Sequence, residues 1–136
     1  MNSLSTQAVK AIIINQNQEI LFVQSDASKH YIWDLPGGLI ERNEIEKDAL
    51  KRECYEELKI TITIIEKLFL WKFIRSSDNE EVIVQNYLCS IPQQYSIQLS
   101  DEHINYKWIS MREIEKYNLK DSSLKKGLKH YFNRKY

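Results

Sequence analysis

The order in which strand-like and helical patterns follow one another constrains the fold of this chain more than any other feature of its sequence. Apolar runs rich in β-branched and aromatic residues predict strands at residues 8–15, 20–24, 61–74, 81–89 and 104–109. Polar turns separate the first two strands and the next two, so we expect two hairpins. Helical patterns lie between and after the hairpins. This order predicts an α/β domain with helices packed on a mixed or antiparallel sheet.

Residues that favour helix starts indicate where the helices begin. Residues 43–58 have helical periodicity, and Asn43 is the expected N-cap. Ser110 and Glu113 have the spacing of a capping box, which predicts a short helix after residue 110. Asp121 is placed to cap a last helix, whose apolar residues recur at an amphipathic spacing. These apolar residues are Leu124, Leu128, Tyr131 and Phe132.

Length, charge and cysteine content limit the class of protein. The 136 residues suit one domain, which we place at residues 1–136. The 19 basic and 19 acidic residues balance, which argues against a broad electrostatic grip on DNA or on an anionic membrane. The N-terminus lacks a signal-peptide pattern, and no apolar run reaches membrane-spanning length. Cys54 and Cys89 have no metal-finger spacing, so we expect buried, reduced thiols in a cytoplasmic protein.

The helix expected at residues 43–58 carries carboxylates on one side. At about 100° per residue, Glu53, Glu56 and Glu57 fall in one sector, which also contains the small Ala49. Like charges at this spacing destabilise a bare helix, whereas a divalent cation would be bound by them. Oxygen ligands suit Mg²⁺ or Mn²⁺, and we expect Ala49 to leave room for the ion or a substrate. A separate apolar seam, expected to pack on the sheet, consists of Leu50, Cys54 and Leu58.

Two glycines, Gly37 and Gly38, precede this helix and let a ligand approach the backbone closely. Exposed N–H groups at the start of a helix favour phosphate. A phosphate site beside a metal site is what hydrolysis of a phosphoanhydride requires, because the metal neutralises phosphate charge and a carboxylate activates water. Taken alone, the acidic face also suits a solvated surface and the glycines suit a simple turn.

Residues 38–60 resemble the Nudix box, G-x5-E-x7-R-E-U-x-E-E-x-G-U, in which U is a bulky apolar residue. Gly38 and Glu44 match its first two fixed letters, and Arg52–Ile60 matches the rest except at one position. There Lys59 replaces a glycine that serves the helix exit, where a positive φ is often needed. With six of seven fixed letters present, the chain resembles a small, MutT-like Nudix hydrolase. The resemblance implies an α/β/α sandwich with a mixed sheet flanked by helices.

The resemblance also implies an activity and assigns roles to the box residues. It implies a pyrophosphohydrolase, dependent on Mg²⁺ or Mn²⁺, that cleaves a nucleoside diphosphate linked to another group. Glu53, Glu56 and Glu57 would be the principal metal-binding and catalytic carboxylates, with Glu53 the favoured general base. Glu44 and Arg52 would support catalysis through an ion pair at the junction of loop and helix.

Further metal ligands are implied outside the acidic helix face. In the family a glycine carbonyl, here that of Gly37 or Gly38, often joins the metal shell. A carboxylate from a later loop is often added, and Glu102 is the best match, with Asp101 second and a solvated loop residue as the alternative. The neighbouring His103 is expected to be a surface residue.

Candidate substrate contacts lie on both sides of the box. The rings of Phe22, Tyr31 and Trp33 are able to stack on a base, although for Phe22 and Trp33 a place in the core is the stronger alternative. Asn118 lies where some relatives contact the base. The backbone of the two glycines completes this expected substrate site.

The substrate favoured by the resemblance is a nucleoside triphosphate, damaged or not, with 8-oxo-dGTP as one example. The products would be a nucleoside monophosphate and pyrophosphate. RNA 5′-triphosphate ends are the alternative substrate. The competing function is a Nudix-like domain that senses or binds a nucleotide without catalysis, and an unrelated α/β domain with an accidental box is the third interpretation. We therefore expect a small nucleotide as partner, with no DNA and no membrane, and the family leaves a homodimer open.

Overall fold

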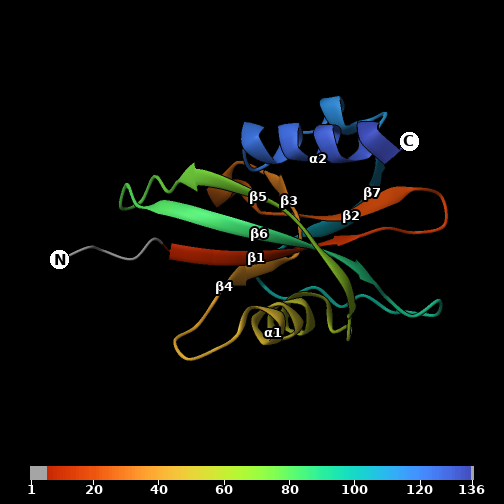
Figure 1. The fold of residues 1–136 in the computed structure, drawn as a ribbon, viewed down its shortest axis with the longest axis horizontal. Helices are drawn as coiled ribbons and strands as arrows, with labels where there is room; N and C mark the ends of the chain where they lie inside the picture. Colours follow the sequence, from red (N-terminus) through yellow and green to blue (C-terminus); the bar gives the residue numbers. More distant parts are fainter. Residues whose placement is uncertain (1–5, 136) are drawn as a thin grey trace.

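The computed structural model describes residues 6–135, which form seven strands, two α-helices and two 3₁₀ turns (Figure 1). The strands are β1 (Thr6–Ile13), β2 (Glu19–Gln24), β3 (Trp33–Asp34), β4 (Gly37–Leu39), β5 (Thr63–Ile74), β6 (Glu81–Ser90) and β7 (Asn105–Ser110). The helices are α1 (Glu46–Leu58) and α2 (Ser122–Lys135), and the 3₁₀ turns are Ala27–Lys29 and Ile114–Lys116. The first five residues, where we expect no signal peptide, lie outside the described part.

The strands form two sheets that lie between α1 and α2 (Figure 1). The larger sheet has the order β4-β1-β6-β5, and the smaller has the order β3-β2-β7. Strand β1 is parallel to β6 and antiparallel to β4, so the larger sheet is mixed. The predicted α/β/α sandwich, with a mixed sheet flanked by helices, is confirmed.

The first predicted hairpin is wrong. Strands β1 and β2 belong to different sheets, and within residues 6–135 they meet at a single bridge between Ile14 and Ile20. The physical reason is that β1 is covered on both faces, with Ala8 in one core and Val9 in the other. A strand buried on both faces suits the interior of a sheet. Strand β1 therefore pairs with β4 and β6, while β2 pairs with β3 and β7.

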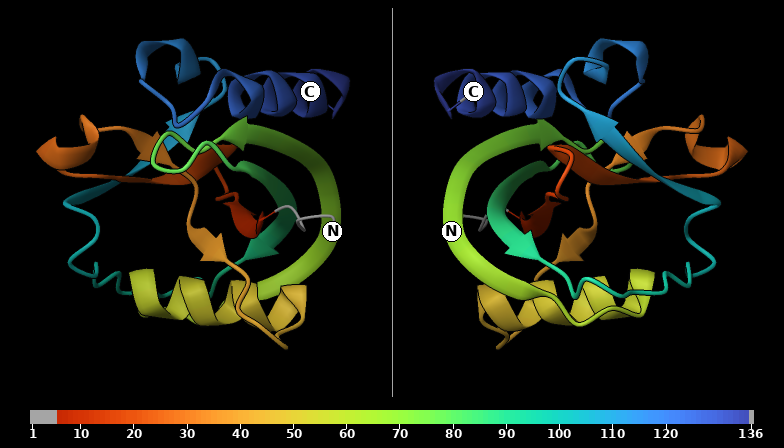
Figure 2. Two further views of the ribbon diagram at one scale, coloured as in Figure 1. Left: turned by 90° about the vertical axis from the view of Figure 1, so that its left-hand side faces the viewer. Right: turned by 90° about the vertical axis from the view of Figure 1, so that its right-hand side faces the viewer.

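The second predicted hairpin is confirmed, because β5 and β6 pair antiparallel. The register between them shifts twice, once between Ile64 and Glu66 and once between Lys67 and Leu70. Such irregularities bend a strand, and Figure 2 shows β5 curving from the side of α1 to the side of α2. The bend carries the aromatic end of β5 towards α2.

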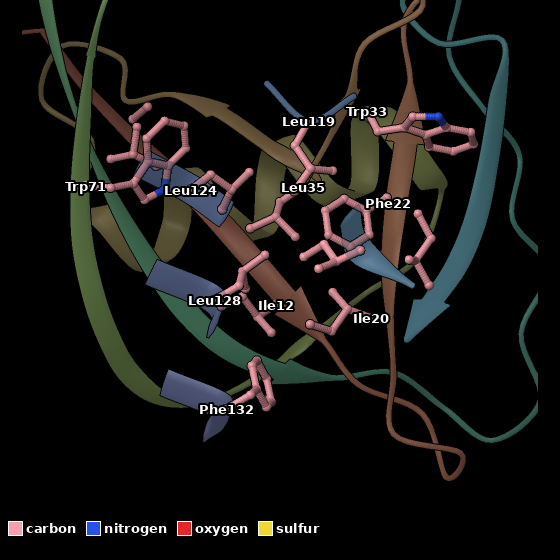
Figure 3. Packing of buried hydrophobic residues seen from close by; sticks show 14 of the residues in the cluster. Ile12, Ile20, Phe22, Trp33, Leu35, Trp71, Leu119, Leu124, Leu128 and Phe132 are labelled. Atoms are coloured by element: carbon pink, nitrogen blue, oxygen red, sulfur yellow. The ribbon is translucent and has the colours of Figure 1, made fainter. Parts of the chain in front are cut away.

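Two hydrophobic cores fill the space between the layers. Figure 3 shows the core next to α2, where Phe22, Trp33 and Trp71 pack with the leucines of that helix. The core next to α1 contains the predicted apolar seam of this helix and also Ala49, which is fully buried. Ala49 therefore packs against the sheet, and the expectation that it leaves room for an ion or substrate is wrong.

Helix α1 starts later than predicted and ends at the unusual lysine. Its N-cap is Ile45 in an extended conformation, whereas Asn43 lies in the preceding turn with a φ of 67°. At the other end Lys59 adopts the left-handed conformation, with φ 59° and ψ 35°. Its N–H donates to the Tyr55 carbonyl at 2.8 Å. The residue that replaces the box glycine thus takes up the backbone conformation that a glycine would favour.

The predictions for the starts of the two later helices have different outcomes. Asp121 caps α2 as predicted, since its Oδ1 accepts from the Ser123 N–H at 2.8 Å. Ser110 instead donates its hydroxyl to the side chain of Glu113 at 3.3 Å, and a single 3₁₀ turn follows. Among the described residues, none of the helices has the length and apolar character needed to cross a membrane.

Candidate active site

Gly37 and Gly38 bring β4 close to both β1 and α1. Gly37 has a φ of 138°, and a Cβ on it would lie 2.1 Å from the Val9 carbonyl oxygen. A Cβ on Gly38 would lie 2.5 Å from Cδ of Glu53. Because neither residue has a side chain, β4 passes directly between the strand and the acidic face of the helix.

The guanidinium of Arg52 donates hydrogen bonds to three carboxylates and forms an ion pair with a fourth, Glu41, at 3.5 Å. Its Nε and Nη2 donate to Glu44 at 2.7 and 2.9 Å, which is a bidentate ion pair. Its Nη1 donates to Glu53 at 3.0 Å and to Glu56 at 3.3 Å, and Nη2 also donates to the Leu39 carbonyl. Hydrogen bonding to Arg52 lowers the pKa of Glu44 to about 2. Arg52 therefore fixes the orientation of carboxylates that would otherwise repel one another.

The three carboxylates on α1 differ in exposure, with side chains that are 17% exposed at Glu53, 56% at Glu56 and 4% at Glu57. Burial raises the pKa of Glu53, although Arg52 opposes this effect. Glu57 points into the protein, where its Oε2 accepts from the Gly37 N–H at 2.7 Å. Burial raises the pKa of Glu57 to about 8, despite this hydrogen bond.

Lys10 is a buried cation beside Glu57 that the sequence patterns did not single out. Its Nζ donates to Asp34 Oδ2 at 3.0 Å and to the carbonyls of Leu35 and Gly37 at 3.2 and 3.4 Å. Burial lowers the pKa of Lys10, but the charges of Asp34 and Glu57 outweigh it, so the net shift is upward and the amine stays charged. A lysine in the middle of an apolar strand was the feature that could have indicated this role.

The loop after β6 brings further side chains to the end of α1. The N–H groups of Gln98 and Ser100 donate to carbonyls of the last turn of the helix at 3.0 and 3.2 Å. This anchoring places Glu102 and His103 next to Glu57. One ligand atom from each of these three side chains lies within 4.8 Å of the others.

His103 is not the surface residue that the sequence suggested. Its side chain is 13% exposed, and its Nδ1 lies 3.5 Å from Glu57 Oε1 without the geometry of a hydrogen bond. Burial lowers the pKa of His103, and the charge of Lys10 adds to this effect. Its position directly after Glu102 was the one clue in the sequence.

These side chains fit a divalent cation. Carboxylate oxygens are the ligands that hard cations prefer, and four carboxylates face this region from α1 and the later loop. Gly38 leaves open a space beside Glu53 that any side chain would fill. Buried Nδ1 of His103 has no hydrogen-bond partner within residues 6–135, and in the neutral tautomer protonated at Nε2 it would offer a lone pair to a cation. The four carboxylates are those of Glu53, Glu56, Glu57 and Glu102.

A cavity of about 220 Å³ adjoins Gly38. The ring of Trp71 in its wall stacks on Phe73 at 5.5 Å between centroids, and the amine of Lys120 lies 5.0 Å from the centre of the Phe73 ring. The indole N–H of Trp71 is buried and has no hydrogen-bond partner among the described residues. Arg75 adds a second cation to the lining. The cavity thus combines an aromatic wall with two cations, of which Arg75 is paired with Asp78.

The side chains predicted to contact the substrate are not those that line this cavity. Phe22 and Trp33 are buried in the core next to α2, so they have no free ring face for a base. Tyr31 is 52% exposed in the loop before β3. Asn118 is exposed, and its backbone carbonyl accepts from the Trp33 N–H. Residues far apart in the sequence, from β1, β5 and β6, form the wall instead.

Comparison with known proteins shows clear relatives. The chain matches the model of the NUDIX domain over residues 4–131. It is 30% identical to the CTP pyrophosphohydrolase of Escherichia coli (strain K12), over 82% of this chain and 81% of that protein. It is 28% identical to the 8-oxo-dGTP diphosphatase of Buchnera aphidicola subsp. Schizaphis graminum (strain Sg), over 83% of each. It spans 66% of the length of a further relative, from Bacillus subtilis (strain 168).

The fold is similar to that of solved structures. The MutT protein from Methanosarcina mazei Go1 superposes with a TM-score of 0.81 at 23% identity. The match covers 99% of this chain and 98% of that one. The arrangement of sheets and helices is therefore shared along nearly the whole chain.

Proposed function

Because the chain belongs to the Nudix family, we propose that it hydrolyses a nucleoside triphosphate to the monophosphate and pyrophosphate, with Mg²⁺ or Mn²⁺ bound at α1. Nudix hydrolases act on phosphoanhydride bonds of nucleotides. The two relatives described above are named for 8-oxo-dGTP and CTP. Both compounds are nucleoside triphosphates, which supports this substrate class here.

The position of Gly38 carries the proposal. This residue lines the cavity and also lies against the carboxylate of Glu53. A nucleotide whose base enters the cavity would therefore direct its phosphates past Gly38 towards the carboxylates. The charged amine of Lys10, which also lines the cavity, favours the approach of phosphate.

The side chains around α1 would have different roles in this reaction. Glu53, Glu56 and Glu57 would hold the cation. When bound, a divalent cation neutralises phosphate charge and makes a coordinated water more acidic. Arg52 fixes Glu53, and burial brings the pKa of that carboxyl closer to neutral, which suits a proton acceptor. Glu44 is a positioning residue, because it acts through Arg52.

The donors in the cavity favour a base that carries carbonyl oxygens. The indole N–H of Trp71 lacks a partner among the described residues, and Lys120 offers a further donor, whereas Arg75 is paired with Asp78. A buried donor left unpaired costs about 1–3 kcal/mol, and a carbonyl acceptor on the base would remove that cost once the Trp71 ring turns its covered N–H towards the cavity. Guanine, 8-oxoguanine and cytosine have such carbonyls, whereas adenine has none. We therefore propose keto bases as the preferred substrates.

The test uses purified protein and a panel of substrates. CTP, GTP, 8-oxo-dGTP, ATP and 5′-triphosphorylated RNA are incubated with Mg²⁺, Mn²⁺ or EDTA. We expect metal-dependent turnover of a keto nucleotide that falls by about 10²-fold or more in Glu53→Gln and Glu57→Gln. Asp48→Asn, on an exposed position of the same helix, is the matched control and should keep full turnover.

Three results would redirect the proposal. Unchanged turnover in both glutamine variants would contradict the assignment of the carboxylates. Tight binding of a nucleotide without metal, together with no hydrolysis of any compound, would support a sensing domain instead. Faster cleavage of the RNA than of free nucleotides would move the substrate to RNA ends.

A further inference from the structure

We propose that His103 is a nitrogen ligand of the bound cation, joining Glu57 and Glu102. The inference rests on the proposed function, since it concerns the metal site of that reaction. The Nudix box contains carboxylates as its acidic ligands and specifies no histidine. An imidazole ligand would therefore be a property of this chain and would change which cation its site prefers.

The geometry places the nitrogen where a shared cation requires it. His103 Nδ1 lies 3.5 Å from Glu57 Oε1, and one ligand atom from each of Glu57, Glu102 and His103 lies within 4.8 Å of the other two. Ligand distances of about 2.0–2.2 Å allow two ligand atoms of one cation to be roughly 3–4.4 Å apart. The exposed Glu102 side chain has the freedom to close the remaining gap.

The backbone holds the imidazole in this position. The Ser100 N–H donates to the Glu57 carbonyl at 3.2 Å, and the His103 N–H donates to the Ser100 carbonyl at 3.3 Å. On the other side the Ile104 N–H donates to the Gln24 carbonyl at 2.9 Å. His103 is thus fixed between α1 and β2, with little backbone freedom to turn away from Glu57.

The chemistry of Nδ1 supports coordination. The atom is buried and has no hydrogen-bond partner within the described residues. A buried nitrogen without a partner is costly, and a cation would remove the cost by accepting its lone pair. The neutral imidazole needed for this is favoured by burial and by the nearby charge of Lys10. In the competing arrangement, a small rotation of the ring would let Nδ1–H donate a hydrogen bond to Glu57.

A nitrogen ligand has a measurable consequence for metal preference. Imidazole is a better ligand for Mn²⁺, Co²⁺ and Zn²⁺ than for Mg²⁺, which strongly prefers oxygen. We expect His103→Gln to weaken Mn²⁺ binding by about 10–100-fold and Mg²⁺ binding by clearly less. His130→Gln removes an exposed histidine of α2 and is the matched control.

The direct test is pulsed electron paramagnetic resonance of Mn²⁺ bound to the full-length protein. A coordinated imidazole adds a ¹⁴N modulation to the electron spin echo, and labelling of histidine with ¹⁵N changes its frequency. We expect the modulation in the wild type and in His130→Gln and its loss in His103→Gln. If His103→Gln fails to fold, the comparison of ¹⁴N and ¹⁵N wild-type protein still decides the question.

The outcomes separate this inference from the proposed function. A wild-type spectrum without nitrogen modulation, or a modulation that persists in His103→Gln, overturns the inference even when nucleotides are hydrolysed. A histidine-dependent modulation in a protein that hydrolyses no nucleotide upholds the metal ligand while the proposed function fails. Equal losses of Mg²⁺ and Mn²⁺ affinity in His103→Gln would favour the hydrogen bond to Glu57 and contradict coordination.

Discussion

At the scale of single residues, Glu57 is the most buried of the three candidate metal-binding carboxylates on α1. Its carboxyl is almost fully buried, accepts a backbone N–H and faces the amine of Lys10. In water an ordinary glutamate titrates near 4.5, whereas burial raises the pKa of Glu57 to about 8. Burial therefore favours the protonated form of Glu57 in the metal-free protein, and a cation that binds there competes with this proton.

The raised pKa of Glu57 makes the metal-free fold sensitive to pH. Because the folded state holds the proton more tightly than the unfolded chain, the stabilisation is complete below about pH 4.5 and is lost as the pH rises through about 8. We expect the unfolding temperature in EDTA to fall between pH 5 and 8.5, and to fall less in Glu57→Gln. Circular dichroism melts across this range measure both slopes. Parallel slopes for the two proteins would show that Glu57 does not carry the effect.

Lys59 offers a second prediction for a single residue. A non-glycine residue in the left-handed conformation costs about 1–2 kcal/mol, although the amine of Lys59 lies 5.4 Å from the centre of the Tyr55 ring and recovers part of this. We expect Lys59→Gly to raise the free energy of unfolding by about 0.5–1 kcal/mol, measured in urea. Lys59→Ala keeps the backbone strain and loses the ring contact, so it should lower that free energy. A destabilised Lys59→Gly would mean that the ring contact outweighs the strain.

At the level of elements, the contact of β4 with α1 forms the candidate active site. The two glycines of β4 have different roles in this contact. A Cβ on Gly38 would meet the movable end of the Glu53 side chain, whereas a Cβ on Gly37 would meet the backbone of β1. We expect Gly38→Ala to fold normally but to lose about 10²-fold in turnover, because Glu53 is displaced. Gly37→Ala should instead lower the unfolding temperature strongly. Turnover assays beside thermal melts separate the two, and a fully active Gly38→Ala would contradict the placement of Glu53.

Most individual elements could be predicted from the sequence, because their apolar periodicity is a local property. This periodicity predicts the buried seam of α1 and the approximate bounds of most strands. Strand pairing could not be predicted for β1, since a strand buried on both faces has no alternation to show which neighbour it takes. The N-cap of α1 was also predicted wrongly. Asn43 belongs to the turn before the helix, where it has a positive φ.

At the level of the whole molecule, the box carboxylates could be predicted and their surroundings could not. The pattern of residues 38–60 lies within one loop and one helix, so local spacing was sufficient. Lys10 and His103 reach Glu57 from β1 and from the loop after β6, which only the tertiary fold brings together. The same holds for the cavity, because Trp71 and Arg75 come from or follow β5 while Lys120 precedes α2.

The cavity leads to a prediction about the choice of base. Trp71→Phe keeps an aromatic wall but removes the unpaired N–H, so we expect KM for GTP and CTP to rise about 5–10-fold while KM for ATP hardly changes. Trp108→Phe is the matched control, since its indole N–H donates to the Tyr95 hydroxyl. Steady-state kinetics on the three nucleotides measure the effect. An equal rise for all three would indicate lost packing and no recognition of the carbonyl.

The identity of the products tests most directly whether the chain is a metal-dependent pyrophosphohydrolase of nucleoside triphosphates. Mass spectrometry would follow the breakdown of one keto nucleotide, such as CTP or 8-oxo-dGTP, with Mg²⁺ and again with EDTA. We expect equal amounts of nucleoside monophosphate and pyrophosphate with Mg²⁺, and neither product with EDTA. Release of a nucleoside diphosphate and orthophosphate, or cleavage that continues in EDTA, would contradict the proposed reaction.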